Sequence, residues 1–143
     1  MKQMGKPIHS FSVPSSFLEK MAQEDRPDGR AGWTTEEAQK KGARREELKE
    51  QKLFYSWLNL RGILFYNPRS DKASTIRAGA PDFTVFYQSK TLFLEFKAPG
   101  WKQSPAQIEF ERDATQAGFT YLVVYSAQQA MEVCRSFFEL PRL

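Results

Sequence analysis

Residues 81–97 contain two strand-like runs joined by a very short link, and this arrangement constrains the fold more than any other part of the sequence. The runs PDFTVFYQ and TLFLEFK are rich in the aromatic and branched residues that strands favour. A link of two to four residues makes them an antiparallel hairpin. A helix-type segment and an apolar run at residues 119–126 follow, and a strand–helix–strand passage favours a parallel crossover. The sequence therefore predicts a mixed sheet.

A long, highly charged helix is expected ahead of the hairpin. Thr34 followed by Glu37 fits a capping box that opens the helix. The apolar spacing is that of an amphipathic helix up to Leu60, with a possible break at Gly42, and Gly62 ends the pattern.

The remaining elements complete the predicted order of helix, three strands, helix, strand and helix. A short strand over residues 63–67 leads into a long basic and polar loop. Ser104 and Pro105 have the N-cap and N1 arrangement of a helix start. Residues 119–126 are expected to form a strand buried on both faces, and residues 127–140 an amphipathic closing helix with Cys134 on its apolar side. The fold class expected is α/β, with a mixed four-stranded sheet flanked by helices.

Composition limits the number of domains and the kinds of chemistry. With 143 residues, of which 41% are hydrophobic, the chain can build one compact core. We expect one domain over residues 34–143, and a poorly ordered arm over residues 1–33. One cysteine and one histidine exclude an internal disulfide and a Cys/His zinc site. No apolar run has the length of a membrane span, so we expect a soluble, intracellular protein without membrane contact.

The charges at the end of the hairpin are candidates for a functional site. Side chains alternate along a strand, so Glu95 and Lys97 share one face, roughly 6.6 Å apart. A two-residue turn at Ser89 and Lys90, or a four-residue turn over residues 88–91, sets Asp82 opposite Lys97. A turn of odd length would send Asp82 to the other face unless a bulge restored the register.

Two neighbouring carboxylates repel each other, and a divalent cation with oxygen ligands stabilises both in the ionised form. Mg²⁺ suits this arrangement, because it takes one or two carboxylates and leaves positions for phosphate oxygens. A nearby lysine can position or deprotonate a water and offset charge on a phosphoryl group, as phosphodiester hydrolysis requires. The plain alternative is a turn at Pro81-Asp82 and a solvent-facing ion pair between Glu95 and Lys97. The order of these motifs behind a basic, glycine-bearing loop favours a functional site.

The strings RAGAPD and FLEFKAPGWKQSPAQ, followed by a helix that ends in AGF, resemble the VRR-NUC (virus-type replication-repair nuclease) module of the PD-(D/E)xK nuclease superfamily. The resemblance covers residues 45–140 approximately. It implies a restriction-endonuclease-like core and a Mg²⁺-dependent endonuclease, with Mn²⁺ as a substitute. It also implies that Asp82, Glu95 and the Phe96 backbone carbonyl are metal ligands, and that Lys97 assists the attacking water.

The resemblance assigns two further catalytic positions. Gln107 corresponds to the glutamine of the module and is expected to orient Lys97 or to contact phosphate. The family also uses a glutamate on the first helix as a metal ligand. Glu47 matches best, with Glu50 as the rival, because the phase of the helix decides between them.

Basic and aromatic side chains around the expected site form a plausible contact surface for phosphates. Trp101 can stack on a base, or it can anchor its own loop. The set of expected nucleic-acid contacts is Arg69, Lys72, Arg77, Trp101 and Lys102.

The family also suggests substrates and partners. Small members of this family resemble Holliday-junction resolvases, so branched DNA and a homodimer are expected, with no small-molecule cofactor. The location would be the host cytoplasm if a phage encodes the chain. Two alternatives remain: a catalytically inactive module that binds branched DNA, and a viral protein that binds another protein. The sequence does not decide whether the substrate is DNA or RNA, or whether it is branched or linear. It also leaves the sequence preference, the oligomeric state and the source organism open.

Overall fold

The structure of the chain is a computed structural model that describes Gly32 and residues 34–68 and 76–142. The expected arm at residues 1–33 lies outside the described residues except for Gly32, and its boundary stays a prediction. Within the described ranges, no helix is long and apolar enough to cross a membrane. The described elements are α2 (Thr35–Leu60), β1 (Leu64–Tyr66), β2 (Phe83–Tyr87), β3 (Lys90–Phe96), α3 (Pro105–Gln116), β4 (Thr120–Val124) and α4 (Ala127–Phe137).

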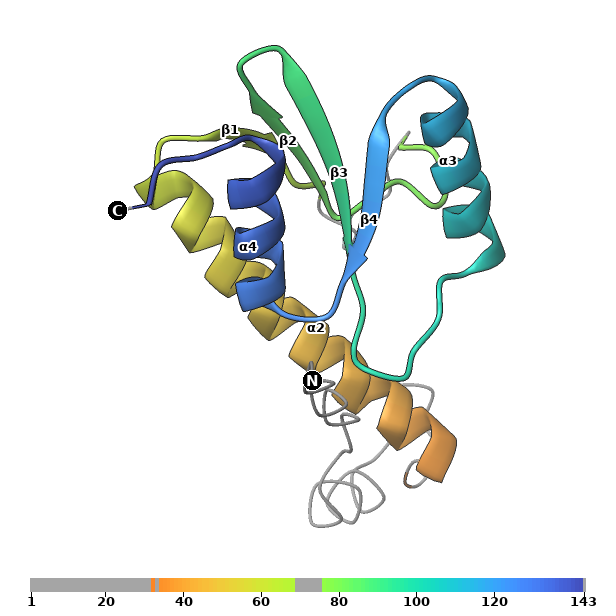
Figure 1. Cartoon of the computed structure of the whole chain (residues 1–143). Helices are drawn as coiled ribbons and strands as arrows, with labels where there is room; N and C mark the ends of the chain where they lie inside the picture. The colour runs from red at the N-terminus through yellow and green to blue at the C-terminus, as the bar shows by residue number, and fades with distance from the viewer. Residues whose placement is uncertain (1–31, 33, 69–75, 143) are drawn as a thin grey trace, which may run out of the picture.

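The strands form one mixed sheet, as the sequence predicts. Their order is β1-β2-β3-β4. The β1–β2 and β2–β3 pairs are antiparallel, whereas β3 and β4 run parallel and are connected through α3. Figure 1 shows α2 and α4 on one side of the sheet and α3 on the other, beside β4. The fold class and the element order are therefore confirmed.

The hairpin turn differs from the expected one by one position. Gln88 and Ser89 form the turn, both with positive φ (46° and 63°), as the favoured two-residue hairpin turns require. The register pairs Phe83 with Leu94 and Tyr87 with Lys90. The expectation that Asp82 lies opposite Lys97 is therefore wrong, because the ladder is displaced by two residues. An even displacement keeps Asp82 on the same face as Glu95.

The main core lies between the sheet and the helices α2 and α4. Phe54 and Leu58 from α2 are fully buried against strand residues of β2 and β3, and Cys134 of α4 is buried in the same cluster, as expected. Ring contacts join Phe54 to Phe83 and to Phe96 at centroid distances of 5.0 and 5.7 Å. This packing fixes the ends of β2 and β3 relative to α2.

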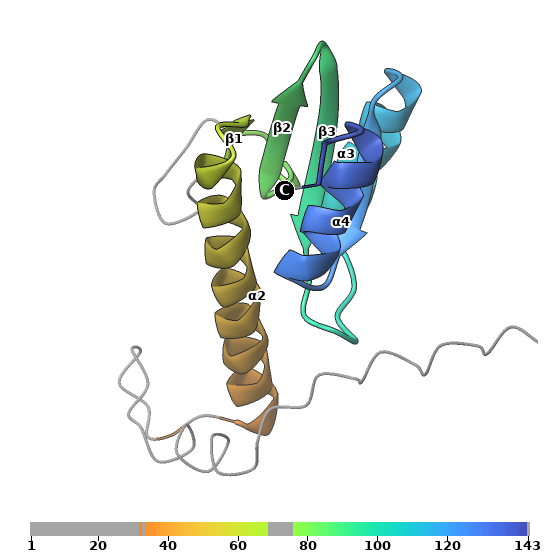
Figure 2. The ribbon, with the colours of Figure 1, turned by 60° about the vertical axis from the view of Figure 1, so that its left-hand side comes forward.

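Helix α2 is continuous through Gly42, so the break that glycine suggested does not occur. A single interior glycine costs only about 1 kcal/mol relative to alanine, and the helix begins with the predicted capping box between Thr34 and Glu37. At its other end Gly62 has φ +66°, and the Ile63 N–H bonds to the Leu58 carbonyl, which closes the last turn. Figure 2 shows α2 extending well past the sheet.

Strand β4 is less buried than its apolar sequence suggests. Tyr121 and Val124 are buried, but Leu122 is 37% exposed. The reason is its position, because β4 forms one edge of the described sheet. The expectation of a strand buried on both faces is therefore wrong along part of its length.

Candidate active site

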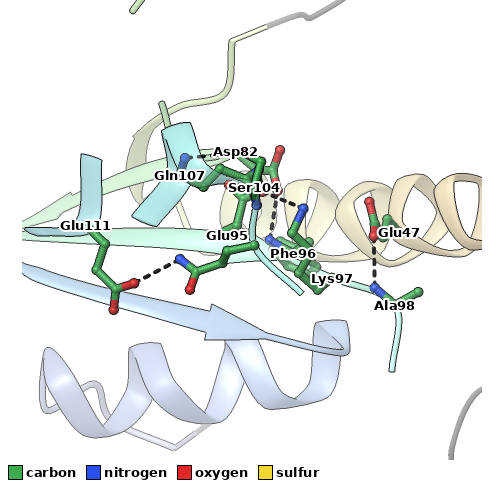
Figure 3. Close-up of polar contacts among 10 residues, drawn as sticks. Glu47, Asp82, Glu95, Phe96, Lys97, Ala98, Ser104, Gln107 and Glu111 are labelled. Atoms are coloured by element: carbon green, nitrogen blue, oxygen red, sulfur yellow. Dashed lines mark hydrogen bonds and ion pairs between the residues drawn. The ribbon is translucent and has the colours of Figure 1, made fainter. Parts of the chain in front are cut away.

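Asp82 and Glu95 lie next to each other where β2 begins and β3 ends. Extending the β2–β3 register by one step beyond Phe83 and Leu94 places these two residues side by side. Asp82 Oδ2 accepts a hydrogen bond of 2.8 Å from the backbone N–H of Phe96. The Glu95 side chain is only 3% exposed. Figure 3 shows both carboxylates at this end of the hairpin, so the sequence prediction of a carboxylate pair agrees with the geometry.

Lys97 lies at the end of the same strand as Glu95. Its Nζ is 3.5 Å from Glu95 Oε1, and its side chain is 14% exposed. The backbone N–H of Lys97 bonds to the Val124 carbonyl at 2.9 Å, which continues the β3–β4 ladder and holds the lysine at the sheet end. A partly buried ammonium group thus contacts the carboxylate pair from one side.

Gln107 contacts Glu95 and not Lys97. Its Nε2 donates a hydrogen bond to Glu95 Oε1, while its Oε1 accepts the Ser104 N–H at 2.8 Å. The second bond belongs to a capping box, because the Gln107 N–H bonds to the Ser104 hydroxyl in return. The helix start predicted at Ser104 and Pro105 is confirmed, and it brings Gln107 to the carboxylates (Figure 3). Contact with phosphate stays a prediction.

The glycine of RAGAPD lies against the first turn of α3. Gly79 has φ +81°, and a Cβ built there would be 2.1 Å from the Ala106 carbonyl oxygen and 2.7 Å from the Gln107 nitrogen. Only glycine fits so close to another backbone. This contact positions the segment before Asp82 against the helix that carries Gln107.

The two glutamates of α2 have different partners. Glu47 Oε1 accepts the Ala98 N–H at 3.0 Å, next to Lys97, and the Glu47 charge acts on Asp82. Glu50 Oε2 accepts the Ala127 N–H at 2.7 Å and so caps the start of α4. The helix phase that sequence could not fix therefore brings Glu47 toward the site. Figure 3 shows Glu47 bonded to Ala98.

Burial raises the pKa of both strand carboxyls. Desolvation is the main cause for Asp82, with the Glu47 charge adding to it, and the pKa reaches about 6. For Glu95, desolvation followed by the Asp82 charge raises the pKa to about 8. Keeping both groups ionised at neutral pH is therefore costly even with the Lys97 ammonium group beside them.

A divalent cation fits one feature of this arrangement. Glu95 Oε2 is buried and has no hydrogen-bond partner among the described residues, although a buried carboxylate oxygen is normally satisfied. A hard cation with oxygen ligands suits that atom and the adjacent Asp82. Within residues 34–68 and 76–142, no three acidic, histidine or cysteine side chains form a ready ligand group, so Glu47 does not complete a three-carboxylate cluster here.

The expected nucleic-acid contacts are only partly placed. Arg69 and Lys72 lie outside the described residues. Arg77 pairs with Asp113 of α3 and lies 5.3 Å from the centre of the Phe110 ring, so it already has a partner.

Trp101 and Lys102 lie in the segment that links β3 to α3. The Trp101 N–H bonds to the Ala98 carbonyl in a turn where Gly100 has φ +86°. Trp101 is half-buried, and Lys102 is exposed. Their contact with nucleic acid stays a prediction.

Two side chains that sequence reasoning missed lie close to the carboxylates. The Asn67 amide donates to the Asp82 carbonyl. The Tyr121 hydroxyl is buried, and desolvation together with the Glu95 charge raises its pKa, while the neighbouring Gln103, whose Nε2 donates to Glu111 at 2.9 Å, acts in the opposite direction. No motif marks these positions, because they meet only through strand pairing and helix packing.

Comparison with known proteins supports the fold. No family model and no curated protein matches the sequence. A solved structure described as "VRR_NUC domain" matches with a TM-score of 0.52 and 23% identity, over 65% of this chain and 98% of that chain. The chain therefore has the fold of a VRR_NUC domain, which is the α/β nuclease-type fold that the sequence motifs suggested.

Proposed function

We propose that the chain is a Mg²⁺-dependent endonuclease that hydrolyses phosphodiester bonds in DNA, with Mn²⁺ as a substitute. The observation that carries the proposal is the pair of half-buried Asp82 and buried Glu95, with Lys97 beside it and a Glu95 oxygen that has no hydrogen-bond partner among the described residues. The shared fold with a VRR_NUC domain supports the same assignment.

Each residue near the pair has a proposed task. Asp82, Glu95 and the Phe96 carbonyl would hold the cation, with Glu47 as a further ligand. The cation would supply Lewis-acid polarisation of a phosphate oxygen and of water. Lys97 would orient the attacking water, help to take its proton and offset charge on the phosphoryl group.

Gln107 has a positioning task in this proposal. Its bond to Glu95 Oε1 fixes the carboxylate, and its capping bond to Ser104 fixes the amide itself. Such supporting contacts commonly change metal affinity or activity by 10–100-fold when removed, an order-of-magnitude range. Trp101 and Lys102, which follow the site in sequence, are proposed to contact the nucleic acid near the cut.

We further propose selectivity for branched DNA and action as a homodimer in the cell interior. A junction has two equivalent strands to cut, which a two-fold symmetric dimer matches. The side of β1 and β2 that α3 leaves uncovered exposes Leu64, Tyr66 and Phe86 (70%, 56% and 37%), and this apolar surface suits a second copy of the chain. Sedimentation of the parent and of Tyr66→Ser would test the dimer.

The experiment for the proposed function compares a labelled four-way junction with linear duplex, single strand and RNA, each with Mg²⁺, Mn²⁺ or EDTA. Metal-dependent cutting of the junction alone is the expected result. Binding of the junction without any cutting would instead favour an inactive DNA-binding module. Absence of salt-sensitive binding would favour a protein-binding role, because phosphate contacts weaken steeply with salt.

A further inference from the structure

A groove lies between the C-terminal ends of α2 and α4, where the described chain also ends. Its volume is about 810 Å³. The lining residues are Trp57, Leu60, Arg61, Glu132, Arg135, Ser136, Leu140 and Arg142. None of them belongs to the carboxylate site.

The charge of this groove is strongly unbalanced. Three arginines line it against a single carboxylate, that of Glu132, which accepts a hydrogen bond from Gln128 at 3.0 Å. In the part of the chain that the structure describes, none of the three arginines forms a salt bridge with a carboxylate. The groove therefore offers guanidinium groups to an external anion.

Two of these guanidinium groups are held in place by an aromatic ring. Arg61 and Arg135 lie 5.2 and 5.5 Å from the centre of the Trp57 ring. Contact with a ring orients a guanidinium without using its N–H donors. Arg61 donates one hydrogen bond to the Pro141 carbonyl at 2.8 Å, and that bond also holds the C-terminal segment. Donors held this way suit the oxygen atoms of a phosphate.

We propose that this groove binds the sugar-phosphate backbone of the nucleic-acid substrate, away from the bond that is cut. The inference rests on the proposed nuclease function, since that function places a polyanion at Asp82 and Glu95. Helix α2 connects the two places. Arg61 is fourteen residues after Glu47, which is about 21 Å along a helix axis.

The reach of nucleic acid matches this separation. One turn of duplex DNA rises about 34 Å, so an arm of ten base pairs that starts at the carboxylates is long enough to reach the groove, whereas an arm of about three is not. An acidic peptide would satisfy the same arginines, but no other feature of the described surface calls for one. The nucleic acid is therefore the occupant that the charges and the helix length favour.

The test compares a substrate with long arms and one with arms of about three base pairs, for the parent and for Arg135→Ala/Arg142→Ala. Arg61 is not substituted, because its bond to the Pro141 carbonyl also holds the C-terminal segment in place. The ratio of kcat/KM for the long substrate to that for the short one should fall about tenfold in the double variant. In EDTA, the slope of log Kd against log salt for the long substrate should fall by about two, one for each lost phosphate contact.

Control variants separate charge from folding. Arg112→Ala removes an exposed arginine of α3 that pairs with Glu109 and Asp113, and it should keep the parent ratio and slope. Arg135→Lys/Arg142→Lys should restore most of the slope, because it restores the charge.

Three results would overturn the inference. The first is a long-to-short ratio of kcat/KM and a salt slope that are both unchanged in Arg135→Ala/Arg142→Ala, and the second is an equal fall of that ratio and slope in Arg112→Ala. The third is a change in the oligomeric state of the double variant, which would make the groove a protein interface. If the parent cuts neither substrate, the nuclease proposal fails, and the salt slopes in EDTA still decide whether the groove binds nucleic acid.

Discussion

Gln107 Nε2 donates a hydrogen bond to Glu95 Oε1 and thereby joins the first turn of α3 to the end of β3. The carbonyl end of the same amide accepts the Ser104 N–H and completes the helix cap. The amide nitrogen therefore contacts the carboxylate site, whereas the amide oxygen caps the helix. Substitutions of Gln107 can remove one of these contacts and keep the other.

Gln107→Glu should keep the cap and remove the contact with Glu95. A glutamate at this position still accepts the Ser104 N–H, but it presents a second negative oxygen to Glu95 in place of a donor. We expect a loss of cleavage of about 10–100-fold with a nearly unchanged melting temperature in the metal-bound protein. Steady-state kinetics and thermal melting measure the two effects.

Gln107→Ala is the matched control, since it removes both bonds. It should lose activity and also about 1 kcal/mol of stability through the weakened cap. Full activity in Gln107→Glu would show that Gln107 does not position Glu95.

Stability of the metal-free protein should fall as pH rises. The carboxyl pKa values of Asp82 and Glu95 are about 6 and about 8 in the folded protein, above their ordinary values of 3.8 and 4.5. Between about pH 4 and pH 8 the folded state therefore binds more protons than the unfolded state, and the free energy of unfolding decreases with pH. With about 1.4 kcal/mol per pKa unit, the loss is on the order of several kcal/mol. Urea unfolding in EDTA across this range measures it.

Glu95→Gln provides the control for that slope. The amide does not ionise, so most of the decrease should disappear, and the variant should be more stable than the parent near pH 8. A parent protein whose free energy of unfolding rises steadily over the same range would contradict the carboxyl environments described above.

Glu47→Gln and Glu50→Gln should have opposite profiles. Glu47 lies beside the site, so its amide variant should lose cleavage by about tenfold or more while the fold is kept. Glu50 caps α4, so its variant should lose about 0.5–1 kcal/mol of stability while activity is kept. Metal titration and thermal melting of both variants check the assignment, and the reverse pattern would make Glu50 the functional glutamate.

Gly79→Ala should be severely destabilising. Its Cβ would lie 2.1 Å from the Ala106 carbonyl oxygen, so the loop or the first turn of α3 must move. Gly118→Ala is the control, because Gly118 has φ +88° but no atom within 4 Å of the added Cβ. The control should cost about 1–3 kcal/mol from backbone strain alone, and Gly79→Ala clearly more. Equal losses in the free energy of unfolding for the two variants, measured with urea, would show that the close contact at Gly79 can be avoided by a shift that costs no free energy.

Much of the fold was predictable, because each element carries its own local signal. The capping residues Thr34 and Ser104 mark the helix starts, and the alternation in residues 81–97 marks the hairpin. The turn was placed one position late, since Gln88 and Ser89 are not residues that usually accept positive φ. The even displacement preserved the face of Asp82, so Asp82 still lies beside Glu95 despite this error.

Contacts between elements account for what sequence missed. The choice between Glu47 and Glu50 depends on how α2 sits against the sheet. The pairing of Arg77 with Asp113 depends on where α3 crosses the segment before β2. The spacing of residues along the chain does not predict contacts between separate elements. The pairing of Asp82 with Glu95 could be predicted, because it follows from the hairpin alone.

The most direct test of the central claim is cleavage by Lys97→Ala beside the parent, on the junction and linear substrates with Mg²⁺ or EDTA. The Lys97 side chain is only 14% exposed, but its ammonium group contacts Glu95 and lies outside the hydrophobic core, so the metal-bound variant should stay folded and keep its DNA affinity. Metal-dependent cleavage should be lost in the variant. Cleavage at the parent rate would contradict it, and the site formed by Asp82, Glu95 and Lys97 would then not be the catalytic centre.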